Sequence, residues 1–178
     1  MKLIRKPQIS VIGDSNPSQE TYNAAYQIGK LLAKMGAIVI TGGKLGIMEA
    51  VAKGVDEENG VSVGILPSSS KDESNFYNTI VMPTDMGHAR NALVVLAADI
   101  VIAMGGGAGT LSELSFGWIY NKPILTLKGY GGWSDEFGNF KVDGKREDYI
   151  VECKSMAVLK KEIEKLCKSL GKTIKEAS

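Results

Sequence analysis

Residues 105–113 read GGGAGTLSE and combine the residue types that bind a phosphate group. Glycines let the backbone approach a ligand closely and take up positive φ angles. Free N–H groups at the start of the following helix, with the helix dipole behind them, favour an anion, and Thr110 adds a hydroxyl donor. A strand–helix turn without a ligand is the alternative, but three consecutive glycines make such a turn costly in backbone entropy. We therefore predict that this segment binds phosphate.

A second segment, residues 41–50, repeats the arrangement with the sequence TGGKLGIMEA: a strand end, a glycine pair and a helix start. Alone it is weak evidence. Together with residues 105–113 it indicates two anion-binding loops at the same edge of a sheet. Lys44 is either a phosphate ligand or a solvated lysine, and the sequence favours neither.

A third segment, residues 87–91, contains Arg90 and Asn91. Arg90 precedes Glu113 by 23 positions and Asn91 precedes it by 22. Arg90 and Glu113 lie near the starts of two predicted helices that flank one predicted strand, so they are candidates for a shared pocket. The alternative is a surface arginine and a glutamate that the helix dipole favours. His88 is the only histidine and is expected to be solvent-facing or structural.

Two common phosphate-binding motifs are absent. A dinucleotide site requires GxGxxG after the first strand and an acidic residue at the end of the second, but the first strand here ends in GDSNPS. A Walker A loop requires GK followed by Ser or Thr, whereas Leu45 follows Lys44. NAD enzymes and P-loop NTPases are therefore disfavoured.

The elements that position these residues follow from apolar runs that alternate with amphipathic stretches. The predicted strands cover residues 8–13, 37–41, 61–66, 79–82, 99–104 and 123–127, with a short edge strand at 149–153. The predicted helices cover 18–35, 46–54, 86–98, the glycine cluster to about 120, and 155–170, while 68–75 and 129–148 are predicted loops, the first of them mobile. This alternation predicts an α/β fold: a Rossmann-like, doubly wound, mostly parallel sheet of about six to seven strands with helices on both faces.

In such a sheet the ligand lies beyond the C-terminal strand ends, near the point where strand order reverses. The glycine-rich and polar segments fall at these ends. The predicted ligand-binding residues are Gly13, Ser15, Gly42, Gly43, Lys44, Gly46, Arg90, Asn91, Gly105, Gly106, Gly107, Gly109 and Thr110.

Composition narrows the function classes. The 178 residues carry a net charge of +1, so no basic surface is predicted for nucleic acid or an anionic membrane. We expect residues 1–178 to form one domain, since no linker or repeat is evident. The N-terminus lacks a signal peptide pattern and no apolar run reaches 18 residues, which predicts a cytoplasmic protein with reduced, partly buried Cys153 and Cys167. With two cysteines and one histidine, no metal site is expected.

The pair of motifs TGG-x-x-GIME and GG-x-GT-x-x-E, preceded by the arginine at this distance, resembles the LOG-like (SLOG) superfamily over residues 9 to about 127. That superfamily includes cytokinin-activating phosphoribohydrolases, often mislabelled as lysine decarboxylases, and molybdenum cofactor carrier proteins. The GYGGW run at residues 129–133 and the chain length look more like the carrier branch. A true lysine decarboxylase holds pyridoxal phosphate on a lysine and is far larger, so that activity is set aside.

The resemblance implies that Arg90 and Glu113 occupy the positions of the hydrolases' catalytic arginine and glutamate. Those enzymes split the N-glycosidic bond of a nucleoside 5′-monophosphate. The chain departs from the hydrolase pattern in two places: Gly105 replaces a proline, and Asn91 replaces a lysine.

Two functions of different classes follow from the resemblance. The preferred one is a carrier-type protein that binds a phosphorylated nucleotide-like ligand, such as a nucleoside monophosphate or the molybdenum cofactor, and requires no cofactor of its own. The alternative is a nucleoside 5′-monophosphate phosphoribohydrolase. The resemblance also implies a homodimer or a dimer of dimers.

Overall fold

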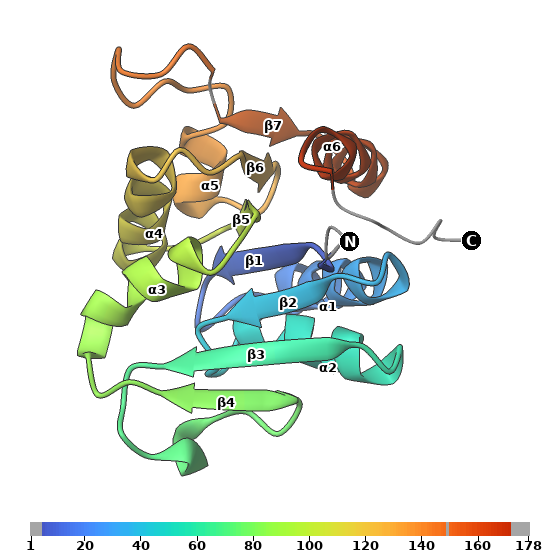
Figure 1. Cartoon of the computed structure of the whole chain (residues 1–178), viewed down its shortest axis with the longest axis vertical. Coiled ribbons are helices and arrows are strands. Elements are labelled where there is room, and N and C mark those ends of the chain that lie inside the picture. The colour runs from blue at the N-terminus through green and yellow to red at the C-terminus, as the bar shows by residue number, and fades with distance from the viewer. Residues whose placement is uncertain (1–4, 149, 172–178) are drawn as a thin grey trace.

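The sheet has seven strands, and every strand pairs in parallel with its neighbours in the order β4-β3-β2-β1-β5-β6-β7 (Figure 1). The computed structural model describes residues 5–148 and 150–171. The strands are β1 (Gln8–Gly13), β2 (Ile38–Thr41), β3 (Val61–Leu66), β4 (Ile80–Pro83), β5 (Ile100–Met104), β6 (Ile124–Leu127) and β7 (Val151–Cys153). The order reverses between β1 and β5, so the predicted doubly wound α/β fold is confirmed.

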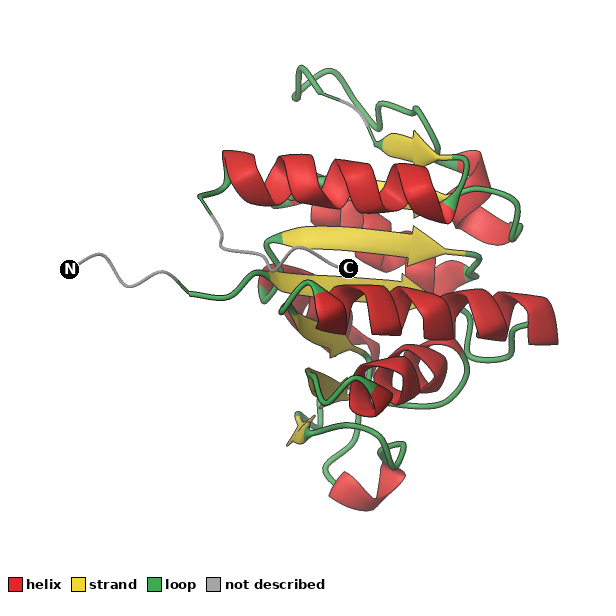
Figure 2. Ribbon diagram, turned by 90° about the vertical axis from the view of Figure 1, so that its right-hand side faces the viewer, coloured by secondary structure: helices red, strands yellow, loops and turns green. Residues whose placement is uncertain are grey.

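Helices cover both faces of the sheet (Figure 2). They are α1 (Gln19–Lys34), α2 (Ile47–Glu57), α3 (Asn91–Leu96), α4 (Ala108–Ile119), α5 (Gly132–Glu136) and α6 (Met156–Ser169), with 3-10 turns η1 (Lys71–Glu73) and η2 (Gly87–Arg90). Ser18 and Ser155 cap α1 and α6, because their side chains accept hydrogen bonds from the N–H groups of Thr21 and Val158. None of the helices within the described residues has the length and apolar character needed to cross a membrane.

The alternation of side chains along each strand explains the two layers. Ile9 and Val11 pack in one core with α1, α2 and α6, whereas Ile12 packs in a second core with α3 and α4. All five residues of β5 are buried, as expected for a strand covered on both faces. The centre of the sheet is therefore tightly packed on both faces, and the loops that follow β1 and β5 extend from it.

Three segments differ from the sequence predictions. The predicted helix over 86–98 begins as the 3-10 turn η2 and becomes α-helical only at α3, after positive φ angles at Asp85 and Gly87. The predicted loop 129–148 contains the short helix α5. The predicted loop 68–75 contains η1 and ends at Asn75, which is 5% exposed. Tyr149, the first residue of the predicted edge strand, lies outside the described residues.

Both cysteines are buried thiols in the core beneath α6. Burial, together with the nearby charges of Glu162 and Glu152, raises the pKa of Cys153 to about 11. A thiol with that pKa is almost entirely protonated near neutral pH and is a poor nucleophile.

Candidate ligand-binding site

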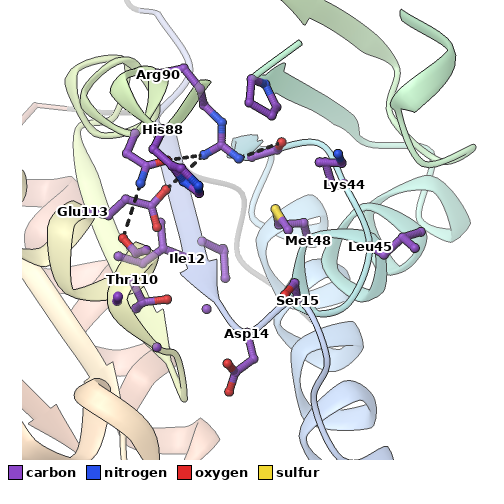
Figure 3. A pocket seen from close by; sticks show the side chains of 18 of the residues that line it. Ile12, Asp14, Ser15, Lys44, Leu45, Met48, His88, Arg90, Thr110 and Glu113 are labelled. Carbon is purple, nitrogen blue, oxygen red and sulfur yellow. Dashed lines mark hydrogen bonds and ion pairs between the residues drawn. The ribbon is translucent and has the colours of Figure 1, made fainter. Parts of the chain in front are cut away.

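A cavity of about 630 Å³ lies at the C-terminal ends of β1, β2 and β5, at the point where strand order reverses (Figure 3). Four chain segments meet there: the end of β1, the turn between β2 and α2, η2 with the start of α3, and the loop into α4. Its polar lining residues are Asp14, Ser15, Lys44, His88, Arg90, Asn91, Thr110 and Glu113. This is the position that a doubly wound sheet reserves for its ligand.

One wall of the cavity is the glycine loop and the first turn of α4. Gly105 and Gly106 have φ angles of +61° and +99°, which side chains rarely adopt, and they turn the chain sharply after β5. The first intrahelical bond of α4 runs from Leu111 N–H to Gly107 O. The N–H groups of residues 108–110 therefore have no partner within the helix, and no side chain caps them.

Gly107 and Gly109 have a different reason to be glycine. Neither has a positive φ, and a Cβ added at either would meet no atom within 4 Å. The fold itself would therefore accept a side chain at both positions. A Cβ at either site would instead project into open space beside the free N–H groups, so the bare backbone is suited to a ligand that approaches it closely.

The glycine loop is held from behind by the first turn of α5. The N–H groups of Trp133 and Ser134 donate to the carbonyls of Gly106 and Gly105 at 3.0 and 3.2 Å. A Cβ at Gly132 would lie 2.5 Å from Gly106 O and 2.6 Å from Gly105 C, so only glycine allows this approach. The GYGGW run thus fixes the loop carbonyls away from the pocket.

The opposite wall is the turn after β2. Gly42 has no space for a Cβ, which would lie 2.4 Å from Nη2 of Arg90. The turn is clamped by Asn75, whose Nδ2 donates to the carbonyls of Gly43 and Lys44 at 3.1 and 2.8 Å. Lys44 extends to Glu73 of η1, with 2.9 Å between Nζ and Oε2.

Arg90 and Glu113 form a buried ion pair at one end of the cavity (Figure 3). Nη1 of Arg90 lies 3.3 Å from Oε1 of Glu113 and 2.7 Å from Oδ1 of Asn91, while Nη2 donates to Gly42 O at 3.2 Å. The two residues are 8% and 6% exposed. Nε of Arg90 is buried and has no hydrogen-bond partner within the described residues. The predicted meeting of Arg90 and Glu113 thus occurs.

Burial dominates the electrostatics of this pair. Desolvation raises the pKa of Glu113 from 4.5 to about 7, and the attraction of Arg90 only partly opposes it. Desolvation also lowers the pKa of Arg90 against the opposing charge of Glu113. Both pKa shifts have the direction that burial causes. The cost of removing the two charged groups from water therefore outweighs the attraction between them across 3.3 Å. A bound anion would therefore meet an arginine that is only partly neutralised.

The cavity gathers most of the predicted site residues. The predicted residues that line it are Gly13, Ser15, Gly42, Lys44, Arg90, Asn91, Gly107, Gly109, Thr110 and Glu113. Gly43, Gly46, Gly105 and Gly106 do not line it and instead shape the two turns that do. His88 is exposed, as expected, yet also lines the pocket. The sequence prediction did not include Asp14, Leu45 and Met48, which line it as well.

Comparison with known sequences and structures confirms the predicted superfamily. The profile of the SLOG cluster4 family matches residues 6–160. An uncharacterized protein of Archaeoglobus fulgidus is 44% identical over 128 residues, which cover 72% of this chain and 82% of that protein. The cytokinin riboside 5′-monophosphate phosphoribohydrolase LOG5 of Arabidopsis thaliana is 32% identical over 144 residues, 74% of this chain but only 63% of the plant enzyme.

The solved structures that are similar include molybdenum cofactor proteins, as the carrier-branch resemblance predicted. The molybdenum cofactor binding protein from the phototrophic bacterium Rippkaea orientalis superposes with a TM-score of 0.81 at 32% identity and covers 91% of this chain and 98% of that one. The molybdenum cofactor carrier protein MCP of Chlamydomonas reinhardtii gives 0.82 at 28% identity, with coverages of 92% and 99%.

Proposed function

The chain belongs to the SLOG cluster4 family, and from this membership and the pocket we propose that it binds a phosphorylated, nucleotide-like small molecule as a carrier-type protein, without turnover. The observation that carries the proposal is the bare backbone at Gly107 and Gly109 beside the free N–H groups of α4. These N–H groups and the helix dipole would hold the phosphate, and Thr110 would add a hydroxyl donor. The rest of the ligand would extend along the cavity between the two walls.

Two features favour binding over catalysis. Gly105 has a φ of +61°, whereas the proline found here in the hydrolase pattern is restricted to about −65°, so the loop differs from the one that pattern allows. Asn91 replaces the lysine of that pattern and uses its Oδ1 to accept from Arg90. The guanidinium of Arg90 thus already donates hydrogen bonds to Asn91, Glu113 and Gly42.

The carrier-type neighbours support the same choice, because they match this chain over almost the full length of both proteins. Because these two neighbours are molybdenum cofactor proteins, that cofactor is one candidate cargo, and nucleoside monophosphates are the other. Mass spectrometry of the small molecule that co-purifies with the chain would distinguish these candidates directly.

Phosphoribohydrolase activity is the second candidate function, and the contact between Arg90 and Glu113 favours it. N-glycosidic hydrolysis needs a carboxylate that handles water or the cationic sugar, and a cation that binds phosphate or assists departure of the base. Glu113 and Arg90 provide both groups inside the cavity.

Incubation with AMP or GMP, followed by assay of free base and ribose 5-phosphate, separates the two functions. As a carrier, the wild type releases no base above background, and Glu113→Gln changes the affinity for AMP only modestly. Base release at about 1 per second or faster that disappears in Glu113→Gln would contradict the carrier proposal and establish the hydrolase.

We also propose that the chain is one cytoplasmic domain that assembles as a homodimer or a dimer of dimers. Met86, just before η2, and Leu96, at the end of α3, are each 46% exposed. Val158 on α6 and Leu170 after it are 39% and 41% exposed, so both regions leave apolar surface for a second copy. Light scattering at micromolar concentration should give at least twice the monomer mass of 19.1 kDa. A mass that stays at 19.1 kDa across that range would contradict assembly.

A further inference from the structure

Asp14 follows β1 and lines the pocket at the end opposite Arg90 (Figure 3). Its Oδ2 accepts a hydrogen bond from the N–H of Gly106 at 3.0 Å, so the carboxylate sits against the glycine loop. A Cβ at Gly105 would lie 3.1 Å from the same oxygen, which shows how closely the loop and the carboxylate pack. The side chain is half-buried beside the glycine loop.

No cation neutralises this carboxylate within residues 5–148 and 150–171. Arg90 and Lys44, which line the same cavity, have other acidic partners, since Arg90 pairs with Glu113 and Lys44 with Glu73. Gly106 N–H is the one hydrogen-bond donor to Asp14 among the described residues, so Oδ1 retains its full accepting capacity.

A purely structural role does not explain the charge. The N–H of Gly106 needs an acceptor, and the amide oxygen of an asparagine would serve. A carboxylate at this place instead puts a negative charge beside an anion-binding helix start. The repulsion weakens phosphate binding unless another group of the ligand interacts favourably with the carboxylate. A ligand hydroxyl would do so, because a charge-assisted hydrogen bond to a carboxylate is stronger than a neutral one.

The spacing defines where that hydroxyl must be. Gly106 and Ala108 are two residues apart, so the Gly106 N–H that holds Asp14 lies within about 7 Å of the first free N–H groups of α4. A group that contacts both Asp14 and the helix start therefore has its hydroxyl about one sugar ring away from its phosphate.

We propose that Asp14 is a specificity-determining residue that accepts a hydrogen bond from a sugar hydroxyl of the ligand, so that the pocket selects sugar phosphates and nucleoside monophosphates. The inference rests on the proposed phosphate-binding function and narrows the ligand class to phosphorylated sugars with a free hydroxyl near the phosphate. In this proposal Asp14 recognises a hydroxyl group of the ligand, and the start of α4 binds its phosphate.

Isothermal titration with AMP, 2′,3′-dideoxyadenosine 5′-monophosphate and inorganic phosphate tests the assignment. The wild type should bind AMP about ten- to a hundredfold more tightly than the dideoxy compound, the range expected for a hydrogen bond to a charged group. In Asp14→Asn, which keeps a neutral acceptor for Gly106, this preference should fall by about five- to tenfold, the difference between a charged and a neutral hydrogen bond. Asp56→Asn, the same change at an exposed position on α2, should keep the wild-type preference.

The possible results distinguish the role of Asp14 from phosphate binding itself. Equal affinity of the wild type for AMP and the dideoxy compound would overturn the role of Asp14 without any variant. A preference that persists in a folded Asp14→Asn protein would overturn it too, while leaving phosphate binding intact. If the wild type bound none of the three compounds, nucleoside monophosphates would be excluded as its ligand and the role of Asp14 with them, while the molybdenum cofactor would remain the candidate cargo.

Discussion

Gly107→Val is expected to abolish the stabilisation of the chain by AMP while leaving the protein alone nearly as stable as the wild type. The φ of Gly107 is −97°, which valine tolerates, and its Cβ would meet no atom of the fold within 4 Å. The branched side chain would instead occupy the space in front of the free N–H groups at the start of α4. At one hundred times its dissociation constant, AMP should add about 2.7 kcal/mol to the unfolding free energy of the wild type and nothing to the variant.

Thermal or urea unfolding with and without AMP measures this effect, and two further glycines provide controls. Gly144 also has open space around it but lies outside the pocket, so Gly144→Val should respond to AMP like the wild type. Gly106 has a φ of +99° and a Cβ there would lie 2.3 Å from Oγ1 of Thr110, so Gly106→Ala should destabilise the protein even without ligand. Unchanged stabilisation of Gly107→Val by AMP would place the phosphate elsewhere.

The buried carboxyl of Glu113 should make the stability of the protein fall as pH rises through neutrality. Because the pKa of Glu113 is about 7 in the folded chain and 4.5 otherwise, the folded state binds a proton that the unfolded state has already released between these values. The stabilising contribution is complete below pH 4.5 and is lost as pH rises through 7. A displacement of this size corresponds to about 3 kcal/mol in the free energy of unfolding.

Urea unfolding of wild type and Glu113→Gln between pH 4.5 and 8 tests this. Glutamine cannot ionise, so the difference in unfolding free energy between the two proteins should move by about 3 kcal/mol in favour of the variant as pH rises. Glu147→Gln, a change of an exposed glutamate, should leave the pH dependence as in the wild type. A pH-independent difference between wild type and Glu113→Gln would show that the carboxyl is ionised throughout.

The sheet and the position of the site could be predicted because local pattern determines them. The apolar runs that form β1, β2 and β5 end in glycine or polar residues, as at Gly13 and Gly42, and parallel strands bring those ends to one edge. The meeting of Arg90 and Glu113 followed from the same reasoning, since both lie near the starts of helices beside β5. In all of these cases the decisive information lies within a few residues of the position concerned.

What the sequence did not indicate depends on contacts between distant segments. Asp14 is tied to Gly106, 92 positions later, and no pattern near residue 14 reveals that bond. Asn75 lies in a polar stretch typical of a loop, yet it is buried because the carbonyls of Gly43 and Lys44 require donors. The 3-10 turn within the predicted helix 86–98 leaves no trace in the sequence, because η2 has four residues, too few to distinguish a period of 3.0 from one of 3.6.

The central place of β1 imposes an order on how the pocket can be assembled during synthesis. β2, β3 and β4 extend the sheet on one side as they emerge, but the other neighbour of β1 is β5, which pairs Ile9 with Ile100. Arg90, the glycine loop and the N–H groups of Trp133 and Ser134 that hold it all come later than β4. A chain still attached to the ribosome at residue 100 thus has half a sheet and no pocket. A ligand bound in the pocket would therefore stabilise only the finished fold, and the long-range pairing of β1 with β5 must form before such a ligand can bind.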